Sequence, residues 1–174
     1  MAERTQQDKG AALRAVIFDA AVLAIALEEL KHVHPRNDVG RGENQLAVEA
    51  ALIKFRSLYD FLFPPPNPRD DDLTVINLGC TQPKNVVPDG ENLRTSIHKY
   101  SAHLTWTRIS EQSEDTIPLF LQRTESLRVP CEIVLAATWD VIREAISKGY
   151  LLNSWGDKYY QTLEKRISSL ALHK

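Results

Sequence analysis

The sequence predicts an all-α fold, an up-and-down helical bundle of about five helices with one long proline-rich loop. Apolar residues recur at helical spacing along most of the chain, and proline and glycine fall between those stretches. No stretch shows the alternation of polar and apolar residues that is typical of a strand. A chain of 174 residues suits one domain, so we expect residues 1–174 to form a single helical domain.

Composition and charge exclude several broad classes of protein. Hydrophobic residues make up 43% of the chain and charged residues 25%, a balance that supports a packed core and argues against global disorder. The formal net charge of −2 argues against a protein dominated by non-specific binding to nucleic acid. Cys80 and Cys131 lack the spacing of zinc ligands. We therefore expect no metal site, no cofactor, and thiols kept reduced in the cytoplasm.

The first helix is expected over residues 10–34, because the following Pro35 ends it. Residues 15–27 are apolar nearly all round, which is typical of a helix surrounded by other helices. The apolar run is short for a membrane span and is interrupted by charged residues, so we expect no membrane association. Residues 1–9 are polar, lack the order of a secretory signal, and are expected to be flexible.

A second helix is predicted over residues 43–63, because its apolar positions are dense and Pro64–Pro66 cannot continue a helix. Residues 64–89 then form the long proline-rich loop, and loops of that length in a compact domain are often functional. Within this loop, Asp70–Asp72 precede an apolar stretch and are expected to cap one short helix.

The third helix is expected to run from about residue 89 to residue 109. Its apolar residues are spaced so that they form one amphipathic seam, which consists of Leu93, Ile97, Tyr100 and Leu104. Amphipathic helices of this kind pack one face against a core, so this helix is expected on the side of the bundle.

Two further helices are expected in the last third of the chain. Thr116 has the character of an N-cap, and the helix that it opens is expected to break or bend at Pro130. This helix should continue to Lys148, with Gly149 as its C-cap. Ser154 followed by Asp157 resembles a capping box for the last helix. The apolar face of that helix consists of Trp155, Tyr159, Leu163, Ile167 and Leu170.

The helix predicted over residues 89–109 carries much of the basic charge of a slightly acidic protein. On a helical wheel, its polar residues fall into two rows on either side of the apolar seam. The first row consists of Arg94, His98, Ser101, Thr105 and Arg108, and the second of Lys99, His103 and Trp106. The first row has groups that bind phosphate, and the second has groups that hold a stacked base. The plainer alternative is that one row faces solvent and the other borders the core.

The helix predicted over residues 43–63 presents a polar row of its own. The row consists of Gln45, Glu49, Arg56 and Asp60. Arg56 and Asp60 lie four residues apart, a spacing at which an ion pair forms across one helical turn. If this row faces the third helix rather than solvent, Glu49 and Asp60 meet Lys99 or Arg108 in a charged hollow.

His103 is the candidate catalytic residue, acting as a general acid or base. It lies between apolar neighbours, where a histidine is more often a core residue that is hydrogen-bonded to a carboxylate or a carbonyl. Asp19 is a natural partner, because a lone carboxylate in the most apolar helix is costly to bury. We therefore expect Asp19 and His103 to form a structural pair.

Residues 97–108, which read IHKYSAHLTWTR, resemble a segment of uncharacterised bacterial all-helical proteins with the pattern N-K-x-x-A-H-L-T-x-x-R. Residues 55–62, followed by Asp71–Leu73, are similar to an upstream element of the same proteins. The resemblance covers roughly residues 45–108, and His98 stands where asparagine is usual. It implies no activity. It does imply which residues matter, namely Arg56, Lys99, His103 and Arg108.

The helical architecture is also similar to that of the nucleotide-binding helical superfamily called HEPN. Its ribonuclease members use an arginine and a histidine with four to six residues between them. Here Arg94 and His98 have three residues between them and Arg166 and His173 have six, with Ile167 where those enzymes usually carry a polar residue. Membership would imply a metal-independent ribonuclease or a nucleotide-binding domain of a defence or toxin system.

Two functions stay open at this point. The first is an interaction module that forms a homo-oligomer or binds a protein partner, because GxSxG, P-loop and HExxH signatures are absent. Four aromatic residues supply either an interface for such a module or ordinary core packing, namely Trp139, Trp155, Tyr159 and Tyr160.

The alternative is a HEPN-like nucleotide-binding domain or ribonuclease. In that reading, RNA or a nucleotide is the ligand, and its phosphate contacts the basic residues of the third helix. Those residues are Arg94, Lys99 and Arg108, with His103 beside them and Trp106 available for stacking on a base.

Overall fold

The computed structural model describes residues 5–31, 38–68, 72–102, 124–150 and 154–170. Within the helices of these ranges, the side chains of residues 38–45, 99–102, 124–126 and 154–155 are not described. The helices that the described ranges contain are α1 (Gln6–Glu29), α2 (Asp38–Leu62), α3 (Gly90–Ala102), α5 (Thr124–Ser147) and α6 (Ser154–Leu170). No strand occurs in those ranges, and the all-α bundle that the sequence predicts is confirmed.

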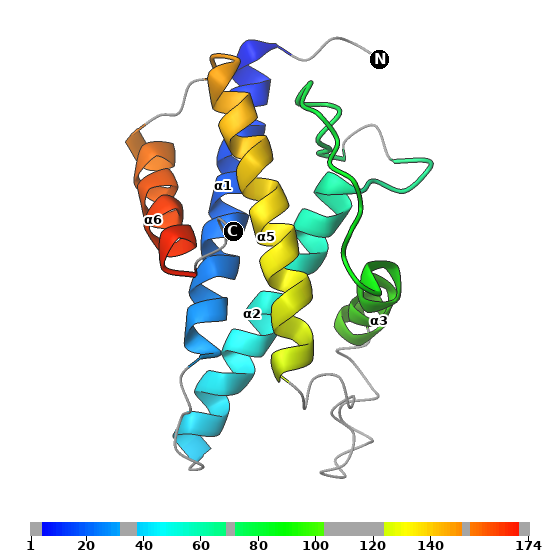
Figure 1. The fold of residues 1–174 in the computed structure, drawn as a ribbon, viewed down its shortest axis with the longest axis vertical. Helices are drawn as coiled ribbons and strands as arrows, with labels where there is room; N and C mark the ends of the chain where they lie inside the picture. The colour runs from blue at the N-terminus through cyan, green and yellow to red at the C-terminus, as the bar shows by residue number, and fades with distance from the viewer. Residues whose placement is uncertain (1–4, 32–37, 69–71, 103–123, 151–153, 171–174) are drawn as a thin grey trace.

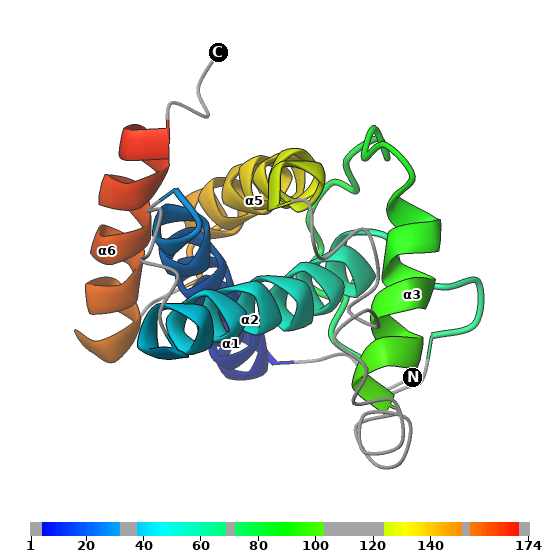
Figure 2. The same cartoon turned by 90° about the horizontal axis from the view of Figure 1, so that it is seen from below.

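Helix α1 is the centre of the bundle. It contacts α2, α5 and α6, whereas α2 also contacts α5 and α3. Helices α1 and α5 run along the long axis in opposite directions, and α6 and α3 lie on opposite sides of them (Figure 1). Helix α3 is seen end-on in Figure 1 and lengthwise in Figure 2, so it lies across the long axis. It is attached to the bundle through α2 and packs outside the central helices.

The composition of α1 explains its central position. Leu13, Ile17, Leu23 and Leu27 are fully buried, and small alanines between them allow the neighbouring helices to approach closely. Among the described helices, only α1 is long and apolar enough to cross a membrane, but 56% of its most apolar window is buried inside the fold. This burial agrees with the expectation from the sequence that the helix lies in the core, surrounded by other helices.

The start of α1 differs from the expectation that residues 1–9 are flexible. Gln6–Lys9 form the first turn of the helix. Thr5 is the N-cap, and a capping box forms in which Thr5 Oγ1 accepts from Asp8 N and Asp8 Oδ2 accepts from Thr5 N. These bonds satisfy amides that a helix start leaves without partners. The helix ends at Glu29, short of the predicted His34, with Leu30 as its C-cap.

Helix α2 begins at Asp38, earlier than predicted, and ends at Leu62 ahead of the prolines, as expected. In the segment after it, residues 75–79 form hydrogen-bonded turns where a short helix was expected. Thr74 Oγ1 accepts from Asn77 N, a side-chain bond that competes with a helical backbone. The segment packs against the core through buried side chains, namely Val75, Leu78, Cys80 and Val87.

Helix α5 is continuous through Pro130, so the chain does not break there, one of the two outcomes expected from the sequence. Thr116, the predicted N-cap, lies outside the described residues. At the other end, Gly149 has a φ of 82°, and Tyr150 N bonds Ala145 O while Gly149 N bonds Ile146 O. This is a Schellman motif, so the predicted glycine C-cap is confirmed.

The last helix, α6, starts at Ser154, as predicted. Its described apolar face is buried through Leu163, Ile167 and Leu170. Tyr159 packs edge-on against Phe18. Of the aromatic residues considered for an interface, Trp139 is 4% exposed and stacks on Tyr160, so these two pack in the core, whereas the side chain of Trp155 is not described.

Candidate functional site

A cavity of about 390 Å³ opens where the end of α2, the segment after it and α3 meet. Ten residues line it, namely Arg56, Ser57, Asp60, Phe61, Pro64, Pro65, Asp72, Leu73, Thr74 and Arg94. This two-arginine pocket contains three of the residues that the sequence singled out, and they come from two different helices: Arg56 and Asp60 from α2, and Arg94 from α3.

Asp60 is at the centre of the pocket's electrostatics. Arg94 Nε donates a short hydrogen bond to Asp60 Oδ1, and Arg94 Nη1 donates to Glu91 Oε1 at 3.0 Å. Arg56 Nε lies 3.7 Å from Asp60 Oδ2, which is an ion pair but too long for a hydrogen bond. The hydrogen bond that Arg94 donates to Asp60 is the main cause that raises the pKa of Arg94 above its ordinary value. The two arginines therefore share one carboxylate unequally.

The local structure explains how these side chains meet. Arg56 and Asp60 are one helical turn apart and project on the same side of α2. Helix α2 stops at Leu62, so that Pro64 and Pro65 turn across the end of the helix and become a wall of the pocket.

Helix α3 reaches α2 through a close approach at Gly90. A Cβ on Gly90 would lie 2.7 Å from Tyr59 Cε2, a distance that real Cβ atoms do not tolerate. The absence of a side chain there lets the start of α3 rest on the Tyr59 ring, and Ile97, which is 1% exposed, anchors the same helix further along. Arg94 lies between these two contacts and is thereby fixed against Asp60.

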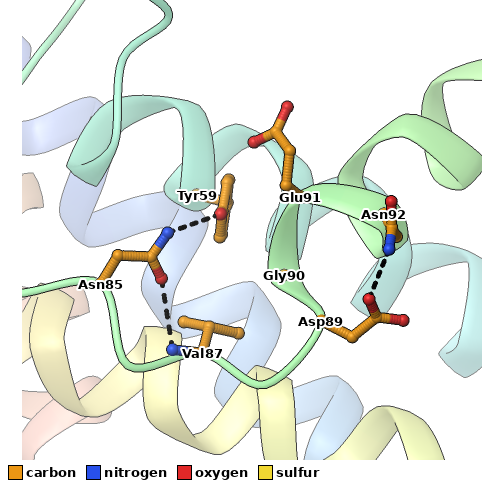
Figure 3. A pocket seen from close by; sticks show the side chains of 7 residues that line it. All are labelled: Tyr59, Asn85, Val87, Asp89, Gly90, Glu91 and Asn92. Atoms are coloured by element: carbon orange, nitrogen blue, oxygen red, sulfur yellow. Dashed lines mark hydrogen bonds between the residues drawn. The ribbon is translucent and has the colours of Figure 1, made fainter.

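A second, more open cavity of about 230 Å³ lies beside the start of α3 (Figure 3). Asn85 Nδ2 donates to the Tyr59 hydroxyl at 2.8 Å, and Asn85 Oδ1 accepts from Val87 N. Asn92 Nδ2 donates to Asp89 Oδ1 at 2.6 Å. These bonds join the preceding segment to α2 and to the first turn of α3, so we interpret this cavity as part of the junction that positions Arg94.

The structure describes only some of the predicted site residues. Glu49 is half-buried on α2 and does not line the two-arginine pocket. Lys99 lies in α3, but its side chain is not described. His103, Trp106 and Arg108 lie outside the described residues. The predicted meeting of Glu49 and Asp60 with Lys99 or Arg108 therefore stays a prediction. Among the described residues, Asp60 pairs with Arg94 of α3, a partner that the sequence did not indicate.

Asp19 has partners that the sequence analysis did not anticipate. Lys54 Nζ donates to Asp19 Oδ1 at 2.5 Å, and Ser57 Oγ donates to Asp19 Oδ2 at 2.6 Å. Lys54 Nζ also lies 5.5 Å from the centroid of the Phe18 ring. The carboxylate is thus neutralised by α2, whereas the predicted pairing with His103 lies outside the described residues and stays a prediction. The helical position of Lys54, on the side of α2 that faces α1, was the signal that sequence reasoning passed over.

The sequence analysis also missed polar residues in and beside the pocket. Asp72 and Thr74 line it from the segment after α2, and Glu91, outside the pocket, supports Arg94 from the first turn of α3. The run of aspartates ahead of an apolar stretch drew attention to this segment, but as a helix cap rather than as a pocket wall. Its true neighbours lie far away in sequence, so no local pattern points to them.

Across the described parts of the chain, no cluster of three or more histidine, cysteine or acidic side chains has the geometry to hold a metal ion. No protein-family model matches the sequence, and neither a curated protein nor a solved structure matches the chain. The resemblances drawn from residues 45–108 therefore stay predictions. The pocket itself offers two guanidinium groups, two carboxylates and an apolar wall, a combination suited to binding rather than, by itself, to bond cleavage.

Proposed function

We propose that this chain is a nucleotide-binding helical domain whose two-arginine pocket receives a ligand that carries a phosphate group. The observation that supports the proposal is the convergence of Arg56 and Arg94, from two helices, on one partly enclosed cavity. Guanidinium groups bind phosphate oxygens through charge-assisted hydrogen bonds and match their geometry. Arg56 has no hydrogen-bond partner among the described residues, and its side chain is 33% exposed, so it can reach a ligand.

The rest of the pocket favours a nucleotide over bare phosphate. Asp60 and Asp72 supply carboxylates, which accept hydrogen bonds from ribose hydroxyls or from base amino groups. Phe61, Pro64 and Leu73 supply an apolar wall against which a sugar or a base can pack. Inorganic phosphate has no ribose or base that could donate hydrogen bonds to these two carboxylates. Its affinity for the pocket is therefore expected to be lower than that of a nucleotide.

Calorimetric titration with adenosine 5′-monophosphate, inorganic phosphate and adenosine tests the proposal. The expected order of affinity is the nucleotide first, then phosphate, with adenosine weakest. Arg56→Gln should weaken nucleotide binding at least tenfold, whereas Arg143→Gln, on the exposed side of α5, should leave it unchanged. Absence of binding to the wild-type protein, or equal binding by both variants, overturns the proposal.

The source of the phosphate group is decided by a second arm of the same experiment. A short single-stranded RNA presents the same phosphate and base chemistry as a free nucleotide. Tighter binding of the RNA than of the mononucleotide identifies a nucleic-acid backbone as the ligand. The proposal stops at binding, because His103, the candidate general acid or base, lies outside the described residues.

A second candidate function is self-association, which one specific observation favours. Leu46 and Ile53 are 69% and 53% exposed, and they lie seven residues apart on one edge of α2. A row of this kind can pair with the same row of a second copy across a twofold axis. Sedimentation of the wild type and of Leu46→Lys/Ile53→Lys tests this. The expected dimer is lost in the double variant but kept in Val86→Lys, and a monomeric wild type overturns the candidate.

Both candidates are proposed for a protein of the cytoplasm. The support is that Cys80 and Cys131 are free and buried, which is usual where thiols are kept reduced.

A further inference from the structure

We propose that Asp60 is the resident counter-ion of the two-arginine pocket: it holds Arg94 as a fixed wall and holds Arg56 loosely until the phosphate of a ligand replaces it. The inference rests on the proposed function and assigns different roles to two arginines that look equivalent in the sequence. Arg56 is the cation that contacts the ligand, and Arg94 is the one that joins α3 to α2.

The two contacts of Asp60 differ in kind. Arg94 Nε donates a hydrogen bond to Oδ1, and the same guanidinium is held from the other side by Glu91. Arg56 Nε is 3.7 Å from Oδ2, where Coulomb attraction acts without a hydrogen bond. Arg94 is thus tied to two carboxylates, and moving it would break both bonds. Arg56 can turn away from Asp60 at small cost.

The position of the weaker pair along α2 supports the same division. Arg56 precedes Asp60 by four residues, and a cation on the N-terminal side of an anion is the less stabilising order on a helix. Both side chains are about one third exposed, so water screens their attraction further. A phosphate that brings hydrogen-bond acceptors to Arg56 therefore competes successfully with Asp60 Oδ2.

The same carboxylate sets a limit on the ligand. An anion beside Arg56 also lies close to Asp60, and like charges at such a distance repel. Asp60 therefore lowers the affinity of the pocket for every anion. It favours ligands in which contacts of a ribose or a base offset this repulsion. Removing its charge should raise the affinity for inorganic phosphate more than the affinity for a nucleotide.

The test compares wild type, Asp60→Asn and Asp140→Asn in calorimetric titrations with inorganic phosphate and adenosine 5′-monophosphate. Asp60→Asn keeps the shape of the side chain and an oxygen that can accept from Arg94. We expect it to bind phosphate about five- to tenfold more tightly than wild type, in line with the removal of one nearby charge. Asp140→Asn, which removes an exposed carboxylate on α5 that does not line the pocket, should change phosphate affinity less than twofold. A purely structural role of Asp60 predicts the opposite, a loss of binding in Asp60→Asn.

A measurement on the wild type keeps the inference testable if Asp60→Asn folds poorly. The Nε–H resonance of Arg56 in a ¹⁵N-labelled protein should shift on saturation with phosphate, while that of Arg94 stays in place. Binding accompanied by movement of Arg94 alone, or phosphate affinity that is equal or lower in folded Asp60→Asn, overturns the counter-ion role and leaves the proposed function standing. Failure of the wild type and of Asp60→Asn to bind either ligand overturns the proposed function itself.

Discussion

Lys54 Nζ on α2 lies 2.5 Å from Asp19 Oδ1 on α1, and this ion pair joins the central helix to its neighbour. Their side chains are only 23% and 20% exposed. Removing either charge would leave the other part-buried without a partner, which costs more free energy than in an exposed pair. Ser57 adds a second hydrogen bond to the same carboxylate and also lines the two-arginine pocket. The pair therefore links the packing of the central helix to one edge of the site.

Lys54→Met should destabilise the fold by about 1–2 kcal/mol, because it leaves the part-buried Asp19 carboxylate without its cation. The double variant Lys54→Met/Asp19→Asn should lose less than the sum of the two single changes, as contacting groups do in a double-mutant cycle. Urea unfolding measures these free energies. Asp140→Asn, in a pair whose side chains are 54% and 67% exposed, is the control and should cost less than about 0.5 kcal/mol. Additive losses in the cycle would contradict the pairing.

Gly90→Ala should destabilise the protein by about 1–3 kcal/mol through overpacking. The added methyl would meet the ring of Tyr59, which is 1% exposed and has no room to retreat. Thermal unfolding and the peptide hydrogen exchange of α3 are the measurements, and exchange in α3 should accelerate.

Gly149 provides the matched comparison for this glycine. Nothing lies within 4 Å of a Cβ added there, but its φ of 82° favours glycine. Gly149→Ala should therefore cost about 1 kcal/mol through the backbone alone, and Gly149→Asn less, because asparagine tolerates that conformation. If Gly90→Ala destabilises the protein no more than Gly149→Asn does, steric contact with Tyr59 does not limit the approach of α3 to α2.

Tyr150→Phe should cost about 1 kcal/mol and loosen the segment before α3, because the hydroxyl donates to the buried Leu78 carbonyl at 2.7 Å. Cys80, two residues further on, reports the loosening. Burial raises the pKa of the Cys80 thiol, and it raises that of Cys131 to about 12, so both thiols of the folded wild type should react slowly with iodoacetamide at pH 8.

In Tyr150→Phe, alkylation followed by mass spectrometry should show faster reaction at Cys80 and an unchanged rate at Cys131. Tyr160→Phe, on α6, is the control and should leave both rates unaltered. Equal acceleration at both cysteines would point to global unfolding instead of local opening.

Glu144 makes stability depend on pH in the acidic range. The hydrogen bond from Lys148, followed by the one from Thr81 N, lowers the pKa of Glu144 below its ordinary value of 4.5. A carboxyl group whose pKa is lower in the folded state than in the unfolded state stabilises the fold at pH values above its ordinary pKa. This stabilisation is lost as the pH falls through the pKa of the folded state. The difference in unfolding free energy between wild type and Glu144→Gln should thus be largest near neutral pH. It should shrink as the pH falls below 4.5.

Urea unfolding at a series of pH values measures this dependence. The contribution of Lys148 to stability depends on pH in the opposite direction. Glu144 raises the pKa of Lys148 above 10.5, so the stability that Lys148 contributes is lost only as the pH rises beyond that value. A difference between the two proteins that is constant from pH 3 to pH 7 would contradict the role of the ionised carboxylate.

Local sequence patterns were sufficient for the helices and insufficient for the contacts of their polar side chains. The all-round apolar character of α1 predicted its burial, and Pro64 and Gly149 marked two helix ends correctly. No local pattern pointed to Lys54 as a partner of Asp19, because the choice among several bases depends on the rotation of α2 against α1. The segment after α2 was expected to contain a helix, but side-chain bonds such as that of Thr74 give it turns instead.

The sequence by itself determined which stretches become helices and which helix is central, because these follow from the spacing of apolar residues and from proline and glycine. It also drew attention to Arg56, Asp60 and Arg94 as an unusual concentration of charge on two helices. Only the tertiary structure decided that Arg94 is bound to Asp60 while Arg56 is held loosely beside it. The physical reason is that helix periodicity fixes the face on which a side chain lies, whereas its partner depends on how two helices are rotated and separated. Here that separation is set by a missing side chain, at Gly90.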